Sequence, residues 1–260
     1  MLPFFRKIRW RFARDNQFFK YARYAVGEIV LVVVGILIAL QINNLNEERI
    51  LRQKEQVLLL QLKKEFESNL DQLDQKIEMR RIMIRSAQRL LIMIDDKTNL
   101  VPDSIGHYLS FTSMSPTFDP IRNDLTTGDK LSLIQDEELK ALLTQWGSNE
   151  EQLEESENRW LHTLDKYFRP LLHEYNLTRE MFEINYQSGS MSLMSIENDA
   201  NHVTMNRAID HNEFVVMMND PRLESHLGWT VGINTFGNME SATLRNHIVD
   251  ILDAINNQIK

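Results

Sequence analysis

One ionisable side chain, that of Glu28, lies at the edge of a long apolar run. The run covers residues 25–42 and has no polar side chain between residues 29 and 40. An ionisable group within a membrane span is costly, so it serves as a proton or cation site or pairs with another group. Glu28 therefore has two interpretations. A ring of such carboxylates in an oligomer would bind protons or cations, whereas one that reaches back to Arg23, Tyr24 or Lys20 of its own or a neighbouring chain would fix helix register.

The helical neighbours of Glu28 favour the structural interpretation. With 3.6 residues per turn, one stripe of the helix holds Tyr21, Tyr24, Glu28, Gly35, Ala39 and Asn46. Gly35 and Ala39 form a small-xxx-small pair, which lets two membrane helices approach closely. Glu28 lies only about one turn inside the basic boundary, and no second acid lies deeper in the run. We therefore predict that Glu28, Gly35 and Ala39 pack one membrane helix against another.

The other residue types that carry chemistry form no recognisable catalytic pattern. The histidines are His107, His162, His173, His202, His211, His226 and His247. They include no H-E-x-x-H motif, and the chain has no G-x-S-x-G motif or glycine-rich phosphate loop. The absence of cysteine excludes a thiolate metal site, a lipoprotein attachment and a disulfide framework. We predict that the protein is not an enzyme and has no catalytic residue, no cofactor and no metal site.

The charge on either side of the apolar run predicts its orientation. Residues 1–23 carry seven basic residues and one acid, although the whole chain has a net charge of −8. A short basic segment before a span keeps the N-terminus in the cytoplasm, which places residues 43–260 in the periplasm of a bacterium. A cleaved signal peptide has the same basic and apolar order. We expect an uncleaved anchor, because the run is long and residues 38–44 lack paired small residues for cleavage.

The segment before the span mixes aromatic and basic residues. Those expected to contact lipid are Arg6, Lys7, Arg9, Trp10, Arg11 and Arg14. Such residues suit the headgroup zone of an anionic leaflet. Nucleic-acid binding is the alternative for a basic aromatic stretch, but the neighbouring span favours membrane lipid as the partner.

Beyond the span, good helix formers continue without proline or glycine to about residue 96. Apolar residues recur at steps of three and four, with Arg80 filling one gap, at Leu62, Phe66, Leu70, Leu73, Ile77, Ile84, Ala87, Leu91 and Ile94. This spacing predicts a bundle-facing or coiled-coil seam. A helix of this kind, about 80 Å long, needs partners to be stable.

Two further long helices are predicted, over residues 136–175 and 220–258. Gly147 allows either a helix stop followed by a new cap or one continuous helix with a bend. Asp220 and Pro221 make a good helix start, and Gly228, Gly232 and Gly237 are expected to permit close approach of a neighbour.

The remaining segments are shorter. Prolines and a glycine predict loops around a short apolar piece, IGHYLSF, over residues 97–124. A short helix is expected to start at Thr178, and residues 187–202 are interpreted as a polar loop. The expected last helix has one apolar face, made of Leu223, Leu227, Leu244, Ile248, Ile251 and Ile255.

Together these patterns predict an all-α protein with three parts. Residues 1–23 are a cytoplasmic or interfacial segment, and residues 24–42 are a single transmembrane helix. This helix continues into a long helix of an elongated extramembrane bundle over residues 43–260, whose long helices span about 43–96, 136–175 and 220–258.

Several motifs resemble one known family. They are FFRKIR near the start, YAVGEIVLVVVGILIALQINNLNEER through the span, LTTGDKLSLIQDEELKALL at 125–143 and NDPRLES at 219–225. They are similar to an uncharacterised family of small single-pass membrane proteins of Bacteroidota, classed as a domain of unknown function. The resemblance implies an inner-membrane anchor and a periplasmic helical domain, and it carries no catalytic residue.

Three functions follow from these observations. The leading hypothesis is a membrane-anchored, homo-oligomeric scaffold whose periplasmic part contacts another envelope protein. The second is a sensory or ligand-binding module that signals through a partner, since residues 1–23 are too few for an output domain. The third is an ion- or proton-conducting assembly that uses Glu28.

Overall fold

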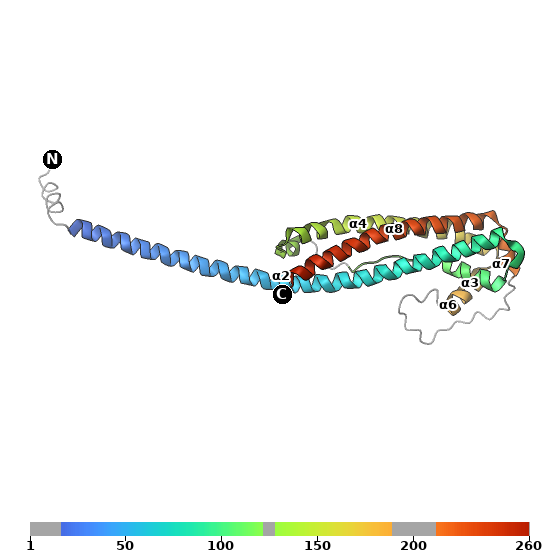
Figure 1. Cartoon of the computed structure of the whole chain (residues 1–260), viewed down its shortest axis with the longest axis horizontal. Coiled ribbons are helices and arrows are strands. Elements are labelled where there is room, and N and C mark those ends of the chain that lie inside the picture. The colour runs from blue at the N-terminus through green and yellow to red at the C-terminus, as the bar shows by residue number, and fades with distance from the viewer. Residues whose placement is uncertain (1–16, 122–127, 189–211, 260) are drawn as a thin grey trace, which may run out of the picture. The chain divides into compact units, whose positions relative to one another are not determined.

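The chain is an all-α protein, as predicted (Figure 1). A computed structural model describes residues 17–121, 128–188 and 212–259, of which 89% are helical and none is in a strand. The chain divides into two compact units, Met1–Val57 and Leu58–Lys260. The elements in order are α2 (Gln17–Asp95), η1 (Lys97–Asn99), α3 (Pro102–Thr112), η3 (Gly128–Leu133), α4 (Glu137–Thr163), η4 (Leu164–Phe168), α5 (Arg169–Glu174), α6 (Thr178–Ser188), α7 (Asn212–Met217) and α8 (Pro221–Gln258).

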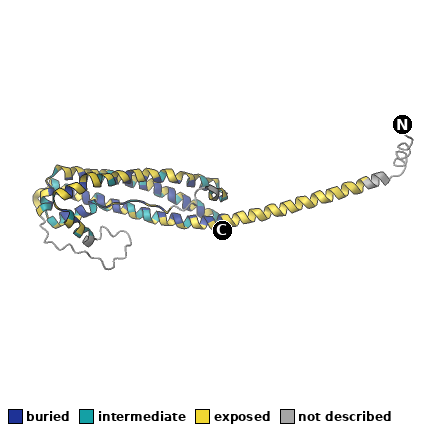
Figure 2. Ribbon diagram, turned by 180° about the vertical axis from the view of Figure 1, so that it is seen from behind, coloured by how far each residue is buried: buried dark blue, intermediate teal, exposed yellow. Residues whose placement is uncertain are grey.

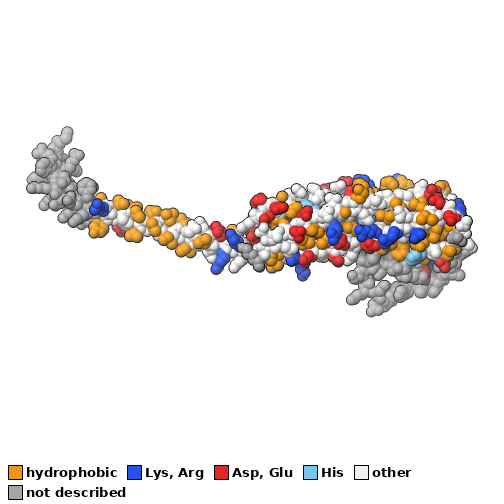
Figure 3. All heavy atoms as spheres, viewed as in Figure 1, with side chains coloured by type: hydrophobic (Ala, Val, Ile, Leu, Met, Phe, Trp, Pro, Cys, Tyr) orange, Lys and Arg blue, Asp and Glu red, His pale blue; other side chains and the backbone are white. Residues whose placement is uncertain are grey.

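Helix α2 is long because little in its sequence interrupts it. Across its 79 residues it has no proline, and its only glycines are Gly27 and Gly35. Every residue from 22 to 54 is exposed (Figure 2). Many of these side chains are large and apolar (Figure 3), including Val26, Ile29, Val30, Leu31, Val32, Val33, Val34, Ile36, Leu37, Ile38, Leu40 and Ile42.

The exposed apolar part of α2 is a candidate membrane span. Within the described residues, one helix is long and apolar enough to cross a membrane, and its apolar window is not buried inside the protein. Burying one large aliphatic side chain is worth about 1.5–3 kcal/mol, so a dozen of them in water is a strongly unfavourable arrangement. Residues 24–42 rise about 28 Å, close to the thickness of a bilayer core.

In the second unit, α4 and α8 pack along the part of α2 that follows Leu58 (Figures 1 and 2). One apolar cluster joins Leu62 and Phe66 of α2 to Trp146 of α4 and Ile248 of α8. The rings of Phe66 and Trp146 meet edge to face, with 5.1 Å between their centroids. The long helices are therefore held together by side chains of one chain.

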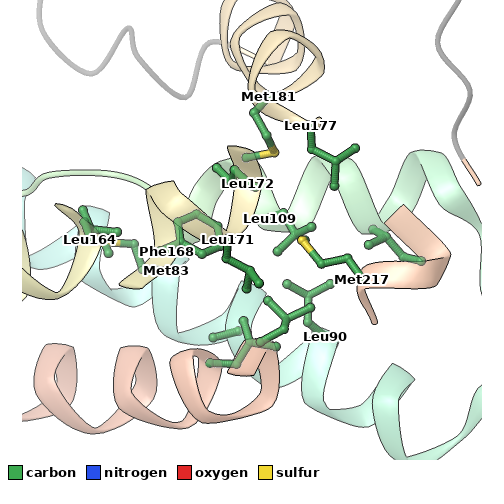
Figure 4. Close-up of a cluster of buried hydrophobic side chains, with 14 of the residues drawn as sticks. Met83, Leu90, Leu109, Leu164, Phe168, Leu171, Leu172, Leu177, Met181 and Met217 are labelled. Atoms are coloured by element: carbon green, nitrogen blue, oxygen red, sulfur yellow. The ribbon is translucent and has the colours of Figure 1, made fainter. Parts of the chain in front are cut away.

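A second apolar cluster occupies the other end of this unit. It joins residues of α2, η4, α5 and the short helices α3, α6 and α7. Figure 4 shows their side chains pointing toward one another: Met83, Leu90, Leu109, Leu164, Phe168, Leu171, Leu172, Leu177, Met181 and Met217. The short helices thus close one end of the core.

The predicted seam of α2 faces the two apolar clusters. Some of the buried positions differ by one residue from those predicted. Leu62, Phe66, Leu73, Ile77 and Ala87 are buried, whereas Leu70, Ile84, Leu91 and Ile94 are only partly buried. The neighbouring residues Asn69, Met83 and Leu90 take the fully enclosed positions instead. The sequence pattern passed over Asn69 because it is polar.

The second long helix continues past Gly147, so the uninterrupted alternative is the right one. Asp136 caps α4, since its side chain accepts a hydrogen bond of 2.8 Å from the Leu139 N–H. Before Pro170 the helix widens into the π-helical turn η4, where Arg169 N–H donates to Leu164 O. A proline lacks an N–H and clashes with the carbonyl four residues earlier, which accounts for the widening.

A left-handed residue ends this helix. Asn176 has φ 54°, and asparagine tolerates that conformation better than most residues. The Leu177 N–H donates to Leu172 O (2.8 Å) and the Asn176 N–H to His173 O (3.1 Å), which is the Schellman pattern. The chain then turns into α6 at Thr178, the predicted start of a short helix.

Residues 102–112, which include IGHYLSF, form helix α3 rather than a piece within a loop. Pro102 lies in its first turn, where a missing N–H costs nothing. The non-helical segment that follows alternates in burial. Met114, Pro116, Phe118 and Pro120 are buried, and the residues between them are more exposed.

Helix α8 begins as predicted, with Asp220 as its cap and Pro221 in the first turn. The Arg222 N–H donates to the Asp220 side chain at 2.8 Å. The apolar face expected for this helix is buried, at Leu223, Leu227, Leu244, Ile248, Ile251 and Ile255. The basic aromatic segment with Arg6, Lys7, Arg9, Trp10, Arg11 and Arg14, and residues 189–202 of the expected polar loop, lie outside the described residues.

Candidate functional site

A buried ion pair between Arg80 and Glu157 lies within the second unit. The Arg80 side chain is 2% exposed, and its guanidinium donates a hydrogen bond to a Glu157 carboxylate oxygen. It also donates to Ser241 Oγ at 2.9 Å and to the Pro116 carbonyl at 3.0 Å. The guanidinium therefore joins α2 to α4, to α8 and to the segment after α3.

Glu157 has a second set of donors. Both of its carboxylate oxygens accept from the Phe118 N–H, at 3.1 and 3.0 Å. Burial raises the pKa of the Glu157 carboxyl, while the charge of Arg80 and the Phe118 N–H favour its ionised form. A buried carboxylate that keeps several donors is one that a fold can tolerate.

The segment after α3 is held by side chains rather than by a sheet. The Gln72 amide donates to Asp119 O (2.9 Å) and accepts from the Asp119 N–H (2.8 Å). Asn69 pairs with the backbone of Ile121 in the same way, at 3.4 and 2.8 Å. Trp160 Nε1 donates to Met114 O at 2.9 Å. These contacts satisfy backbone groups that would otherwise be costly to bury.

Little free space surrounds the ion pair. The cavity beside Arg80 and Glu157 measures about 10 Å³, roughly enough for one water molecule. A Cβ on Gly237 would lie 3.4 Å from Arg80 Nε, which is about van der Waals contact, so the guanidinium packs closely against this glycine without requiring it. Gly228 and Gly232 have open space at the same position, so they make no such approach. The pair is a structural centre rather than a substrate site.

His226 is the second buried polar group of interest. Its ring stacks on Phe168 at 4.2 Å and 8°, and on Trp160 at 5.7 Å and 23°. Among the described residues, neither ring nitrogen has a hydrogen-bond partner. Burial lowers the pKa of His226 to about 4, so the ring is neutral near pH 7. Sequence reasoning missed it; the available signal was its place between Leu223 and Leu227 on an apolar helix face.

The other histidines have ordinary positions. His247 stacks on Trp146 at 6.4 Å, and its Nε2 lies 2.9 Å from Leu142 O. His107, His162 and His173 are exposed. His202 and His211 are not among the residues that the structure describes.

The residues predicted to pack membrane helices lie in the first unit. Glu28, Gly35 and Ala39 are all exposed on α2, and Gly35 has open space within 4 Å of the Cβ position. Their steps of seven and four residues along a continuous helix keep them on one face. The structure thus leaves this face free, whereas the seam from Leu62 to Ile77 packs inside the bundle.

Comparison with known protein families gives one match, over part of the chain. Residues 28–101 match the model of a family described as "Family of unknown function (DUF6090)". The match covers α2 from Glu28 onward and η1, which is less than a third of the chain. This agrees with the resemblance to an uncharacterised family over that region. The searches of curated proteins and of solved structures found no match.

We expect removal of one partner of the buried pair to be severely destabilising. Arg80→Ala leaves the Glu157 carboxyl buried without its cation and should lower the free energy of unfolding by about 3–5 kcal/mol. The double variant Arg80→Met with Glu157→Leu should recover part of this loss, because it buries no charge but leaves the Phe118 N–H and the Pro116 carbonyl without these partners. Urea unfolding followed by circular dichroism measures both.

The matched control for this prediction is Arg245→Ala. Arg245 of α8 pairs with Asp74 of α2 at 2.7 Å, so this pair also joins two long helices, but both side chains are at least 40% exposed. Its loss should cost no more than about 1 kcal/mol. Equal effects of Arg80→Ala and Arg245→Ala would contradict a special role for the buried pair.

His226 predicts a pH dependence of stability. Its pKa is about 4 in the folded state and about 6.5 in an unfolded chain, so the unfolded state binds a proton first as pH falls. Between pH 6.5 and 4 the protein should lose about 3 kcal/mol of stability that His226→Phe does not lose. The difference between the two unfolding curves across pH is the measurement. His162→Gln, at an exposed position, should follow the wild type; parallel curves for His226→Phe and the wild type would show the idea to be wrong.

Proposed function

We propose that the protein is a non-enzymatic, membrane-anchored interaction protein of a bacterial cell envelope. The observation that carries the proposal is the contrast along α2. Residues 22–54 expose their apolar side chains on all sides, whereas from Leu58 onward the same helix is packed into a closed bundle. In this proposal, bilayer lipid removes the apolar side chains of residues 22–54 from water. The bundle core does the same for those that follow Leu58.

The charge distribution supports an inward N-terminus. Seven basic residues precede the span against one acid, and such segments stay on the cytoplasmic side. The bundle, and with it most of the chain's net negative charge, is then presented in the periplasm. A folded helical domain fixed by one span suits contact with another envelope protein, because the membrane restricts both partners to one surface.

Self-association is assigned to the membrane face that contains Glu28, Gly35 and Ala39. These residues are exposed on one side of α2, and small residues at this spacing allow close helix packing. The extramembrane seam does not serve this purpose, since Phe66 and Leu73 are fully buried against the chain's own helices. Glu28 then pairs across the helix interface, and the ion-conducting alternative rests on that carboxylate alone.

A second candidate function is a ligand-binding or sensory module. It is favoured by two sizeable pockets on the second unit. One of about 670 Å³ lies among α3, α5 and α6, and one of about 710 Å³ lies beside η4 and α8. Volumes of this size are typical of small-molecule sites.

The anchored topology can be tested with protease on intact spheroplasts. Protease should remove the bundle and leave a membrane-bound N-terminal fragment, because the cut sites after residue 43 face outward. Alkaline carbonate should not release the intact chain. A protected C-terminal region, or a chain that washes free in carbonate, would refute the proposed anchor and orientation.

Self-association can be tested by disulfide crosslinking in membranes. The chain has no native cysteine, so single variants Gly35→Cys and Ala39→Cys report only on the new site. Both should give crosslinked dimers under mild oxidation, because their face meets a second copy. Leu37→Cys, about 200° around the helix from Gly35, is the matched control and should stay largely monomeric. Only monomers at residues 35 and 39 would remove the homo-oligomer from the proposal.

A further inference from the structure

The pocket of about 710 Å³ opens between the η4–α5 region and the first turns of α8. It combines apolar surface, exposed aromatic rings and one buried polar group. Its lining includes Tyr167, Pro170, Leu171, Pro221, His226 and Trp229. Five of these side chains, Tyr167, Pro170, Leu171, Pro221 and Trp229, are mainly apolar.

The charged groups of this pocket already have partners in the structure. Arg222 pairs with Glu174 and with Asp220, each at 2.7 Å. Lys166 Nζ lies 5.2 Å from the centroid of the Tyr167 ring. A charged ligand would have to compete with these contacts, so the pocket suits a neutral one.

His226 is a buried polar group of the lining that lacks a hydrogen-bond partner among the described residues. Its side chain is 5% exposed, and both ring nitrogens are closed off from solvent without a hydrogen bond. Leaving a polar group buried and unpaired destabilises a fold. A ligand that hydrogen-bonds to the ring would remove this cost.

A ligand reaches the buried ring nitrogens only if the exposed neighbour Trp229 moves aside. Trp229 lies three residues further along α8, which places it beside His226 on the helix surface. It is 48% exposed, and Tyr167 is 57% exposed. Because nearly half of its surface is exposed, the Trp229 side chain has room to turn outward. Its ring then offers a flat surface for stacking.

We infer that this pocket binds a small neutral ligand built on an aromatic ring with a hydroxyl group, the ring packing between Tyr167 and Trp229 and the hydroxyl bonded to His226. A neutral imidazole has one nitrogen that accepts a hydrogen bond, and the ligand O–H donates to it. Aromatic stacking supplies the remaining affinity. The low pKa of His226 supports this arrangement, since the ring stays neutral. The inference rests on the ligand-binding alternative above and not on self-association.

Phenol is the probe for the test, with anisole as its matched control. The two share an aromatic ring and an oxygen, but anisole has no O–H to donate. The full-length protein is held in lipid nanodiscs and labelled with ¹⁵N-histidine, and the imidazole signals of His226 are followed by NMR. Phenol should shift them with a dissociation constant about 5-fold lower than that of anisole, the effect of one hydrogen bond.

Three variants complete the experiment. His226→Phe keeps a flat ring between Phe168 and Trp160 and should abolish the preference for phenol, measured by calorimetry. Trp229→Ala should weaken phenol binding about 5-fold or more. Phe236→Ala, at a similarly exposed aromatic residue of α8 outside the pocket lining, should change it by less than about 2-fold.

Several results would overturn the inference. These are no shift of the His226 signals with phenol, equal binding of phenol and anisole, or unchanged phenol binding in both His226→Phe and Trp229→Ala. Because Trp229 is exposed, its variant remains informative even if His226→Phe does not fold. Crosslinking at residues 35 and 39 is independent of this pocket, so its outcome separates failure of the pocket from failure of the oligomer.

Discussion

The second unit depends on one interaction, the buried ion pair of Arg80 and Glu157. Two charges removed from water destabilise a fold unless each remaining donor and acceptor is paired. Here the Pro116 carbonyl, the Phe118 N–H and the Ser241 hydroxyl complete the set. Apolar contacts are non-directional, whereas this pair has one geometry. The pair lies between the two apolar clusters. It therefore fixes how far α2, α4 and α8 are shifted along one another at that point.

The surface of α2 falls into two parts, one that packs against the chain's own helices and one that is exposed. From Leu58 onward the apolar side chains that face the bundle are buried against the other helices of the chain, so they are not available to another molecule. The exposed part from residue 22 to 54 has no such cover. The proposed association through the face that contains Gly35 is therefore physically separate from the packing that stabilises the bundle. Each is expected to tolerate changes in the other.

The least regular part of the bundle lies beside the 710 Å³ pocket. Pro170 forces the preceding turn into the π-helix η4, and π-helical turns often occur at functional sites. The widened turn brings Phe168 onto the face of His226. An apolar residue at position 226 would pack there with fewer polar atoms to satisfy. The combination of an irregular turn, an unpaired buried imidazole and open space is what distinguishes this end of the bundle from a simple structural core.

Helix identity, the candidate span and the caps at Asp136 and Asp220 were accessible from the amino-acid order, because they depend on neighbours within one or two turns. So was the apolar face of α8. The closing contacts were not. Arg80 meets partners 36, 77 and 161 residues away along the chain, and no local spacing selects those among the chain's 37 acids and many carbonyls. Asn69 and His226 entered the interior for the same reason. Burial of a polar group is decided by what the folded chain places opposite it, and only packing in three dimensions supplies that.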